Sequence, residues 1–332
     1  MEVLGQAAIA YWELYQAQKQ FEIATESLRT ANELLIDARK RLEFGKGTEL
    51  DVLQAEAGVA LRDATRSEAS MRLETARSRV NSYLGRSGAQ GVVIAGEEPE
   101  FFQSDLTFVD LWEQAYETNP SFVNLRKRAD LDGLRVVVGK NAKLPQLDLS
   151  LGYGFSGIGR SVGASLDAAA DQGFPDWSIG LQLRIPFLGD RKGFHELKAA
   201  QLKEKASKLG LSNFGKELEN AIRAAIHTVT TYKNNGERYH QVVVFRERLL
   251  ETQMARIEAG AASSRDALEA EEDLFEVKIT ELANAIQYQR AVLQLEMISG
   301  VLLAKRGLDL SRSELRKRTE VLRRRGNITK AR

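Results

Sequence analysis

The chain has 332 residues, 43% of them apolar and 28% charged, a composition typical of a folded protein and not of a disordered one. It contains no cysteine, which excludes disulfide bonds, thiolate catalysis and cysteine-ligated zinc. The net charge of +1 is uneven, because residues 305–332 carry eleven Lys or Arg against three acidic residues. The sequence contains no run of about 18 apolar residues, so it predicts no membrane-spanning helix. The residues that follow Met1 lack the basic and then apolar pattern of a signal peptide.

The first 84 residues are predicted to form a helical hairpin. Large and small residues each recur every seven positions, the large ones being Leu14, Phe21, Leu28, Leu35 and Leu42 and the small ones Ala10, Ala17, Ala24, Ala31 and Ala38. Such a seam predicts a coiled coil in which alanine lets a neighbouring helix come close. The first helix is expected to end near Phe44, at Gly45-Lys-Gly47. Thr48-Glu-Leu-Asp51 has the form of a capping box, which starts a second helix running to about Leu84.

The same hairpin recurs later in the chain as an internal duplication. Adding 215 to the residue number maps Gly45 to Gly260, Thr48 to Ser263, Asp51 to Asp266, Glu56 to Glu271 and Gly85 to Gly300, and upstream it maps Arg41 to Arg256. The helix that leads into this second turn is expected to run from about Arg191 to Ala259, roughly 100 Å at 1.5 Å per residue.

Two segments of the middle region alternate apolar residues with polar residues or glycine. One apolar face comprises Leu147, Leu149, Leu151, Tyr153 and Phe155, and the other comprises Trp177, Ile179, Leu181, Leu183, Ile185 and Phe187. The pattern predicts transmembrane β-strands, apolar toward lipid and polar toward a lumen. A soluble antiparallel hairpin with one buried face is the alternative, although nothing else in the sequence predicts a partner sheet. Residues 157–175 are expected to form an external loop, with Asp190 as the N-cap of the long helix.

Little in the sequence points to catalysis, a metal or a cofactor. Residues 152–157 match the GxGxxG dinucleotide fingerprint, but the next predicted element is a strand and not the helix that would hold a pyrophosphate. His195, His227 and His240 lack metal-ligand spacing. The basic residues 305–332 are interpreted as a solvated terminus, with nucleic acid or anionic lipid binding as the alternative. The sequence predicts no enzyme and no cofactor.

The order of these features resembles the bacterial outer membrane efflux protein family, or TolC-like outer membrane factors. The matching residues are the two hairpin turns, Asn119-Pro120, Leu144-Pro145-Gln146, residues 177–183 and residues 186–190. The resemblance implies a mainly α, TolC-like fold, in which long α-helical coiled-coil hairpins form a periplasmic α-barrel and a transmembrane β-hairpin contributes to an outer-membrane β-barrel. It also implies a homotrimer in the outer membrane of a Gram-negative bacterium, with most of the chain in the periplasm.

On this resemblance the chain divides into two unequal repeats. The expected divisions are a first-repeat helical hairpin at 1–84, a linker with a short helix at 85–119, a second repeat at 120–304 and the basic tail at 305–332. Within the second repeat we expect a helix at 120–143, a β-hairpin at 146–187 and a long helical hairpin at 189–304. Subtracting 215 places the strands of the first repeat before Met1, which predicts a missing segment of about 100 residues and a signal peptide. A trimer with two strands per chain would have fewer strands than the eight of small membrane barrels.

The function that the resemblance implies is a passive conduit of a tripartite efflux or type I secretion system. The hairpin tips would close the periplasmic end and open when a periplasmic adaptor protein, linked to an inner-membrane pump, engages them. The candidate tip residues are Gly45, Gly47, Thr48, Asp51, Gly260, Ser263 and Asp266. The two aspartates are interpreted as helix caps, with a role in gating as the alternative. The candidate lumen-facing residues are Asp148, Gln182 and Arg184, with simple wetting of the barrel wall as the alternative. The alternative function is a soluble coiled-coil scaffold with a basic tail that binds nucleic acid or lipid.

Overall fold

The computed structural model describes residues 2–86, 92–101, 107–171, 174–185, 191–259 and 261–308. Contacts divide the chain into two compact units, one made of residues 1–120 and 217–332 and the other of residues 121–216. This division follows packing and not the sequence repeat, so the repeat-based domain boundaries stay a prediction.

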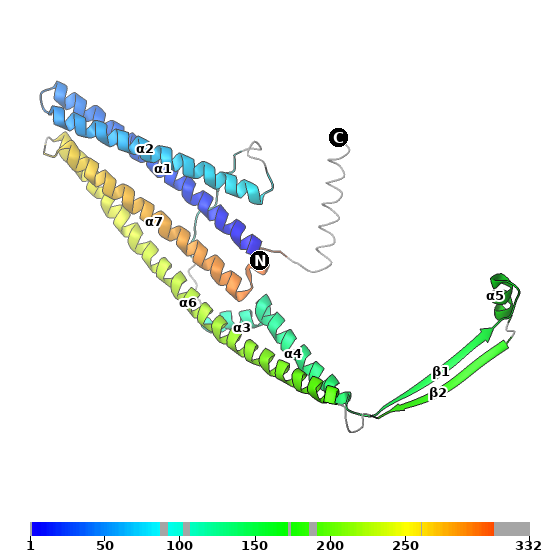
Figure 1. The fold of residues 1–332 in the computed structure, drawn as a ribbon. Coiled ribbons are helices and arrows are strands. Elements are labelled where there is room, and N and C mark those ends of the chain that lie inside the picture. The colour runs from blue at the N-terminus through cyan, green and yellow to red at the C-terminus, as the bar shows by residue number, and fades with distance from the viewer. Residues whose placement is uncertain are drawn as a thin grey trace. The chain divides into compact units, whose positions relative to one another are not determined.

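The first unit contains the two predicted helical hairpins (Figure 1). The hairpins are α1 (Glu2–Glu43) with α2 (Glu49–Tyr83), and the end of α6 (Arg191–Glu258) with α7 (Ser264–Ser299). Helix α1 packs against both α2 and α7, and the short helices α3 (Phe108–Thr118) and α8 (Leu302–Lys305) pack against α7. The turns of both hairpins lie at the same end of this unit. The expected helices are confirmed to within one or two residues, including the 68-residue α6.

The predicted seam of α1 is confirmed at its alanines and wrong at its last large residue. All five alanines are buried, as are Leu14 and Leu35, whereas Phe21 and Leu28 are half-buried. Leu42, in the final turn of α1, is 40% exposed. The alanines are therefore the consistently buried positions of the seam.

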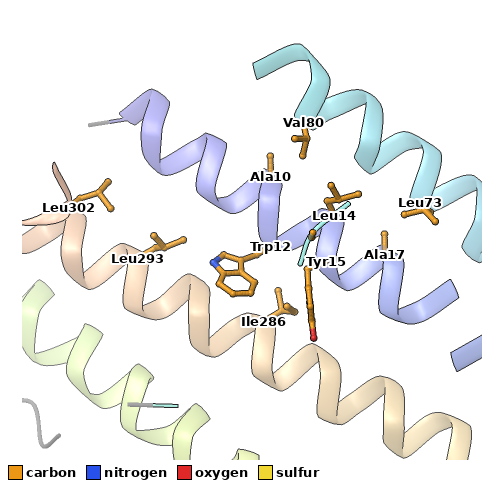
Figure 2. Packing of buried hydrophobic residues seen from close by; sticks show 11 residues of the cluster. Ala10, Trp12, Leu14, Tyr15, Ala17, Leu73, Val80, Ile286, Leu293 and Leu302 are labelled. Atoms are coloured by element: carbon orange, nitrogen blue, oxygen red, sulfur yellow. The ribbon is translucent and has the colours of Figure 1, made fainter. Parts of the chain in front are cut away.

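The core of the first unit lies around α1, which packs against α2 on one face and against α7 on another (Figure 2). Leu14 lies toward Leu73 and Val80 of α2, while Trp12 and Tyr15 lie toward α7, beside Ile286 and Leu293. Burying a large apolar side chain contributes about 1.5–3 kcal/mol to stability. The two hairpins are thus held together by apolar burial on two faces of α1.

The duplication also appears in the backbone at the ends of α2 and α7. Gly85 and Gly300 both adopt left-handed conformations, with φ of +64° and +79°. Their surroundings differ, because Thr118 Oγ1 donates to the Ser299 carbonyl at 2.7 Å, fixing the end of α3 against α7. A Cβ atom on Gly300 would lie 2.6 Å from the carbonyl carbon of Thr118, whereas one on Gly85 would meet nothing within 4 Å.

The second unit contains α4 (Pro120–Asn141), which begins at the boundary, together with β1 (Gln146–Ser156), α5 (Val162–Ala170), β2 (Phe174–Arg184) and the start of α6. Asp132 of α4 is buried and accepts a hydrogen bond from Ser207 Oγ of α6 at 2.6 Å, which anchors the two helices. The connection at 157–175, expected to be an external loop, contains the short helix α5, which is capped by the Ser161 side chain.

The two predicted strands form an antiparallel ladder. Leu149 opposes Leu181 and Tyr153 opposes Trp177, so the apolar side chains of both strands share one face, and they are exposed in this chain. Gly152 and Gly154 are strand residues, which excludes the dinucleotide-loop interpretation. The second strand ends at Arg184, and Phe187 and Asp190, expected in the strand and at the helix cap, lie outside the described residues. No described helix combines the length and apolarity that crossing a membrane requires.

Candidate functional site: the hairpin tips and the helices behind them

The first hairpin tip is built from a left-handed glycine and a capping box. Gly45 has a φ of +69°, and the Lys46 amide donates to the Arg41 carbonyl at 2.8 Å, which closes the end of α1. Helix α2 then begins with Thr48, whose Oγ1 accepts the Asp51 amide at 3.2 Å while its own amide donates to Asp51 Oδ2 at 2.9 Å. Gly47 lies between the glycine turn and the capping box, close to the backbone of α1.

The second tip repeats this geometry. Ser263 Oγ accepts the Asp266 amide at 3.4 Å, and the Ser263 amide donates to Asp266 Oδ2 at 2.9 Å. The Ala261 amide donates to the Arg256 carbonyl at 2.8 Å, which is the bond of the first tip shifted by 215 residues. Gly260 lies outside the described residues.

Both tip carboxylates are held in their ionised form. Hydrogen bonds from the Thr48 side chain, and then from its backbone, lower the pKa of Asp51 below its ordinary value. For Asp266 the backbone amide of Ser263 is the main cause of the lowered pKa, and the Ser263 side chain adds to it. A carboxylate that accepts such bonds stays charged at neutral pH. The geometry therefore accounts for both aspartates as helix caps.

One side chain links the two tips directly. Arg41 Nη2 of the first hairpin donates to Ser264 Oγ of the second at 2.7 Å. Arg256, its counterpart in the repeat, instead donates to the Ala261 carbonyl of its own turn at 3.1 Å. The repeat makes these two arginines equivalent and does not predict that Arg41 connects the hairpins. Their different partners depend on which hairpin lies alongside, which the repeat alone does not state.

Behind the tips, two ionic junctions connect α1, α2 and α7, the first of them buried and the second partly exposed. In the first, Glu271 of α7 accepts from Arg62 Nε of α2 at 2.8 Å and from Ser27 Oγ of α1, and all three side chains are buried. In the second, Glu13 of α1 pairs with Arg79 of α2 at 2.6 Å and with Arg290 of α7. Neither junction is predicted by the sequence. The only sequence signal was the placement of Glu271 at the repeat position of Glu56.

The candidate lumen-facing residues belong to the second unit. Asp148 opposes Gln182 in the ladder, and Arg184 opposes Gln146, so the predicted residues lie on the polar face of the strand pair. All of them are exposed. Ser150 and Gly180 continue the same face.

The histidines take no part in these arrangements. His240 Nδ1 lies 2.9 Å from Glu281, forming a contact between α6 and α7. Within the part of the chain that the structure describes, no three His, Cys, Asp or Glu side chains are grouped to hold a metal.

Comparisons with known proteins agree with the geometry. Residues 111–301 match the family model of the outer membrane efflux protein. The chain is 24% identical to the outer membrane protein TolC of Vibrio cholerae over 315 residues, covering 92% of this chain and 69% of that protein. It is 25% identical to the alkaline protease secretion protein AprF of Pseudomonas aeruginosa over 308 residues, covering 91% and 62%.

A solved structure shares the fold. The open state of the MtrE outer membrane channel of Neisseria gonorrhoeae superposes with a TM-score of 0.73 at 16% identity, covering 91% of this chain and 66% of that one. The chain therefore spans about two thirds of the length of the proteins that it resembles.

Proposed function

The chain belongs to the outer membrane efflux protein family, and on that premise we propose that it acts as a passive conduit in a tripartite efflux or type I secretion system. The observation that carries this proposal is the combination of paired strands, apolar on one face and polar on the other, with two capped helical hairpins in one chain. Strands of this kind suit an outer membrane, where the apolar face meets lipid. The helices would then lie in the periplasm.

The proposed assembly is a homotrimer that meets a periplasmic adaptor protein and, through it, an inner-membrane pump. Asp148, Gln182 and Arg184 would face the lumen, because they share the polar face of the ladder. The name of the AprF protein describes secretion of a protease, whereas that of another relative, CzcC of Cupriavidus metallidurans, describes resistance to cobalt, zinc and cadmium. The proposal is therefore restricted to export and does not specify the cargo.

Replacing Leu149 by aspartate should prevent stable insertion of the full-length protein into the outer membrane. An aspartate on the lipid-facing side of a membrane strand is unfavourable near the bilayer centre, at a cost below the about 2–4 kcal/mol of a lysine or arginine. Ser150→Asp is the matched control, since Ser150 is the next residue along and lies on the polar face. Membrane fractionation measures the result. Equal insertion of both variants, or wild-type protein that remains soluble without detergent, would contradict the proposal and favour a soluble scaffold.

We further propose that the tips gate the conduit, with Arg41 holding the closed state. Loss of a hydrogen bond from a charged group weakens a contact by about 1.5–3 kcal/mol, so Arg41→Ala should shift the closed-to-open ratio about tenfold or more. Arg256→Ala is the control, because Arg256 bonds within its own turn. Single-channel conductance of the full-length trimer measures the shift. A rise in conductance that is equal for both variants would argue against a contact between the hairpins as the gate.

A further inference from the structure

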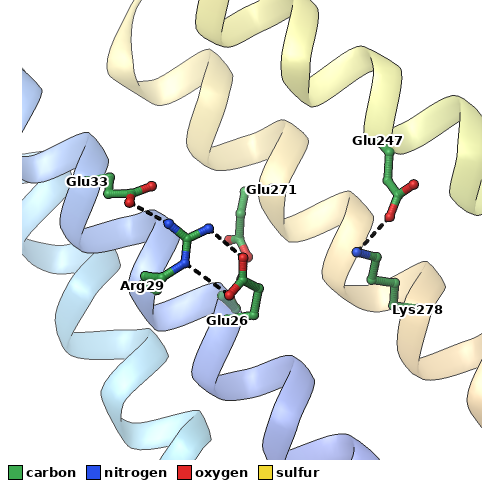
Figure 3. Close-up of polar contacts among 7 residues, drawn as sticks. Glu26, Arg29, Glu33, Glu247, Glu271 and Lys278 are labelled. Carbon is green, nitrogen blue, oxygen red and sulfur yellow. Dashed lines mark hydrogen bonds and ion pairs between the residues drawn. The ribbon is translucent and has the colours of Figure 1, made fainter.

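A groove beside the tips has a strongly acidic lining. It lies between α1 and α6 with α7 as its floor, within the first unit, and has a volume of about 730 Å³ (Figure 3). Seven glutamates line it, against two basic side chains, Arg29 and Lys278. Its apolar lining includes Leu250 and Met254 of α6 and Phe275 of α7. The groove thus combines an apolar floor with an excess of negative charge.

The basic side chains in the groove neutralise only part of this charge. Arg29 pairs with Glu26 and Glu33 on its own helix, and Lys278 pairs with Glu247 at 2.8 Å. Glu251 and Glu258 of α6 have no ion-pair partner among the residues that the structure describes. A cationic segment in the groove would therefore meet carboxylates that have no competing partner.

We propose that this groove is the docking site of the chain's own basic C-terminal segment, residues 309–332. That segment contains nine Lys or Arg residues and three acidic ones, opposite in sign to the groove. It also carries Leu315 and Leu322, which are seven residues apart and suit an apolar floor flanked by carboxylates. Complementary charge of this kind favours one binding surface over others.

Leu308, which directly precedes the segment, lies against the N-terminal part of α1. Leu308 lines a small cavity with Leu4 and Trp12. Residues three and four apart share a helix face, and this face continues through Tyr15, Lys19 and Ile23, which line a second part of the groove of about 590 Å³. The two parts share Ile23, Glu247 and Lys278, so the groove is continuous.

The segment is also long enough to fill the groove. The rise of α1 from Trp12 to Glu33 is about 32 Å at 1.5 Å per residue. The 24 residues after Leu308 span up to roughly 80 Å when extended. Tethering a segment so close to its site raises its effective concentration to about the millimolar range.

Disulfide trapping tests the proposal, because the natural sequence has no cysteine. The groove variant combines Leu322→Cys with Glu251→Cys, and the control combines Leu322→Cys with Glu68→Cys on α2, whose side chain is exposed. In the full 332-residue chain, the groove pair should oxidise to a cross-linked monomer about tenfold faster than the control pair. This advantage should disappear in 1 M salt, where the screening length is about 3 Å.

A third variant isolates the charge of the segment. Replacing Arg323, Arg324 and Arg325 by glutamine in the groove variant should slow cross-linking by about threefold or more, since each exposed ion pair contributes about 0.2–1 kcal/mol, a factor of about 1.4–5. Equal rates at Glu251 and Glu68, an advantage that persists in high salt, or covalent dimers in place of the cross-linked monomer would each overturn the proposal. The readout does not involve export, so its failure is separate from failure of the proposed function.

Discussion

Replacing Arg62 by alanine should lower the free energy of unfolding by about 3–5 kcal/mol, the largest loss that we expect from a single charged residue. Arg62 and Glu271 are 6% and 4% exposed and join α2 to α7 through a 2.8 Å hydrogen bond. Without the guanidinium, the buried carboxyl group of Glu271 loses its cationic partner and keeps the Ser27 hydroxyl as its hydrogen-bond partner among the described residues. Urea unfolding followed by helical circular dichroism measures the loss.

The repeat supplies the control for this prediction. Glu56, which occupies the position of Glu271 in the first repeat, pairs with Arg39 at 2.7 Å, and both side chains are largely exposed. Arg39→Ala should cost less than about 1 kcal/mol, because solvent screens an exposed pair. Replacing Arg62 and Glu271 together by leucine should cost less than Arg62→Ala alone, since no charge is left buried. Similar losses for Arg62→Ala and Arg39→Ala would show that burial of the junction is not what makes it stabilising.

Replacing Gly300 by alanine should destabilise the chain by about 2–5 kcal/mol. The left-handed conformation costs an L-residue about 1–2 kcal/mol, and a Cβ atom there would lie 2.6 Å from the carbonyl oxygen of Thr118. Relieving that overlap requires a shift of backbone, which typically adds 1–3 kcal/mol. The end of α3 would have to move away from α7, with loss of the hydrogen bond from Thr118 Oγ1 to the Ser299 carbonyl.

Gly85→Ala is the matched control for this substitution. Gly85 has a similar φ of +64° and the same place in the repeat, but nothing lies within 4 Å of its Cβ position. We expect a loss of about 1–2 kcal/mol, from the backbone conformation alone. Thermal or urea unfolding measures the loss of stability in both variants, and the difference between the two losses is the cost of the contact between the Gly300 Cβ atom and Thr118. If the two losses are equal, the contact between α3 and α7 does not restrict this position.

Sequence by itself determined the long helices, both turns and both strands of this protein, but not the short helix α5 within the predicted loop. These features depend on neighbours within a few residues, namely the heptad seam of α1, the capping boxes at Thr48 and Ser263, and the alternation along β1. The alternation also identifies the apolar face of each strand, but it fits any register shifted by two residues, so the pairing of Leu149 with Leu181 came from the structure. The repeat further identified the tip residues, although their role as an aperture stays a proposal.

Tertiary structure alone decided how the hairpins are joined. Arg62 and Glu271 are 209 residues apart, and Arg41 and Ser264 are 223 apart. The repeat makes Arg41 equivalent to Arg256 and Gly85 equivalent to Gly300, yet each member of a pair has different neighbours. Local sequence patterns do not predict such contacts, since the burial and pairing of these side chains arise only when α1, α2 and α7 pack together. The physical environment of each position, and with it the energetic effect of each substitution, is therefore a property of the packed helices.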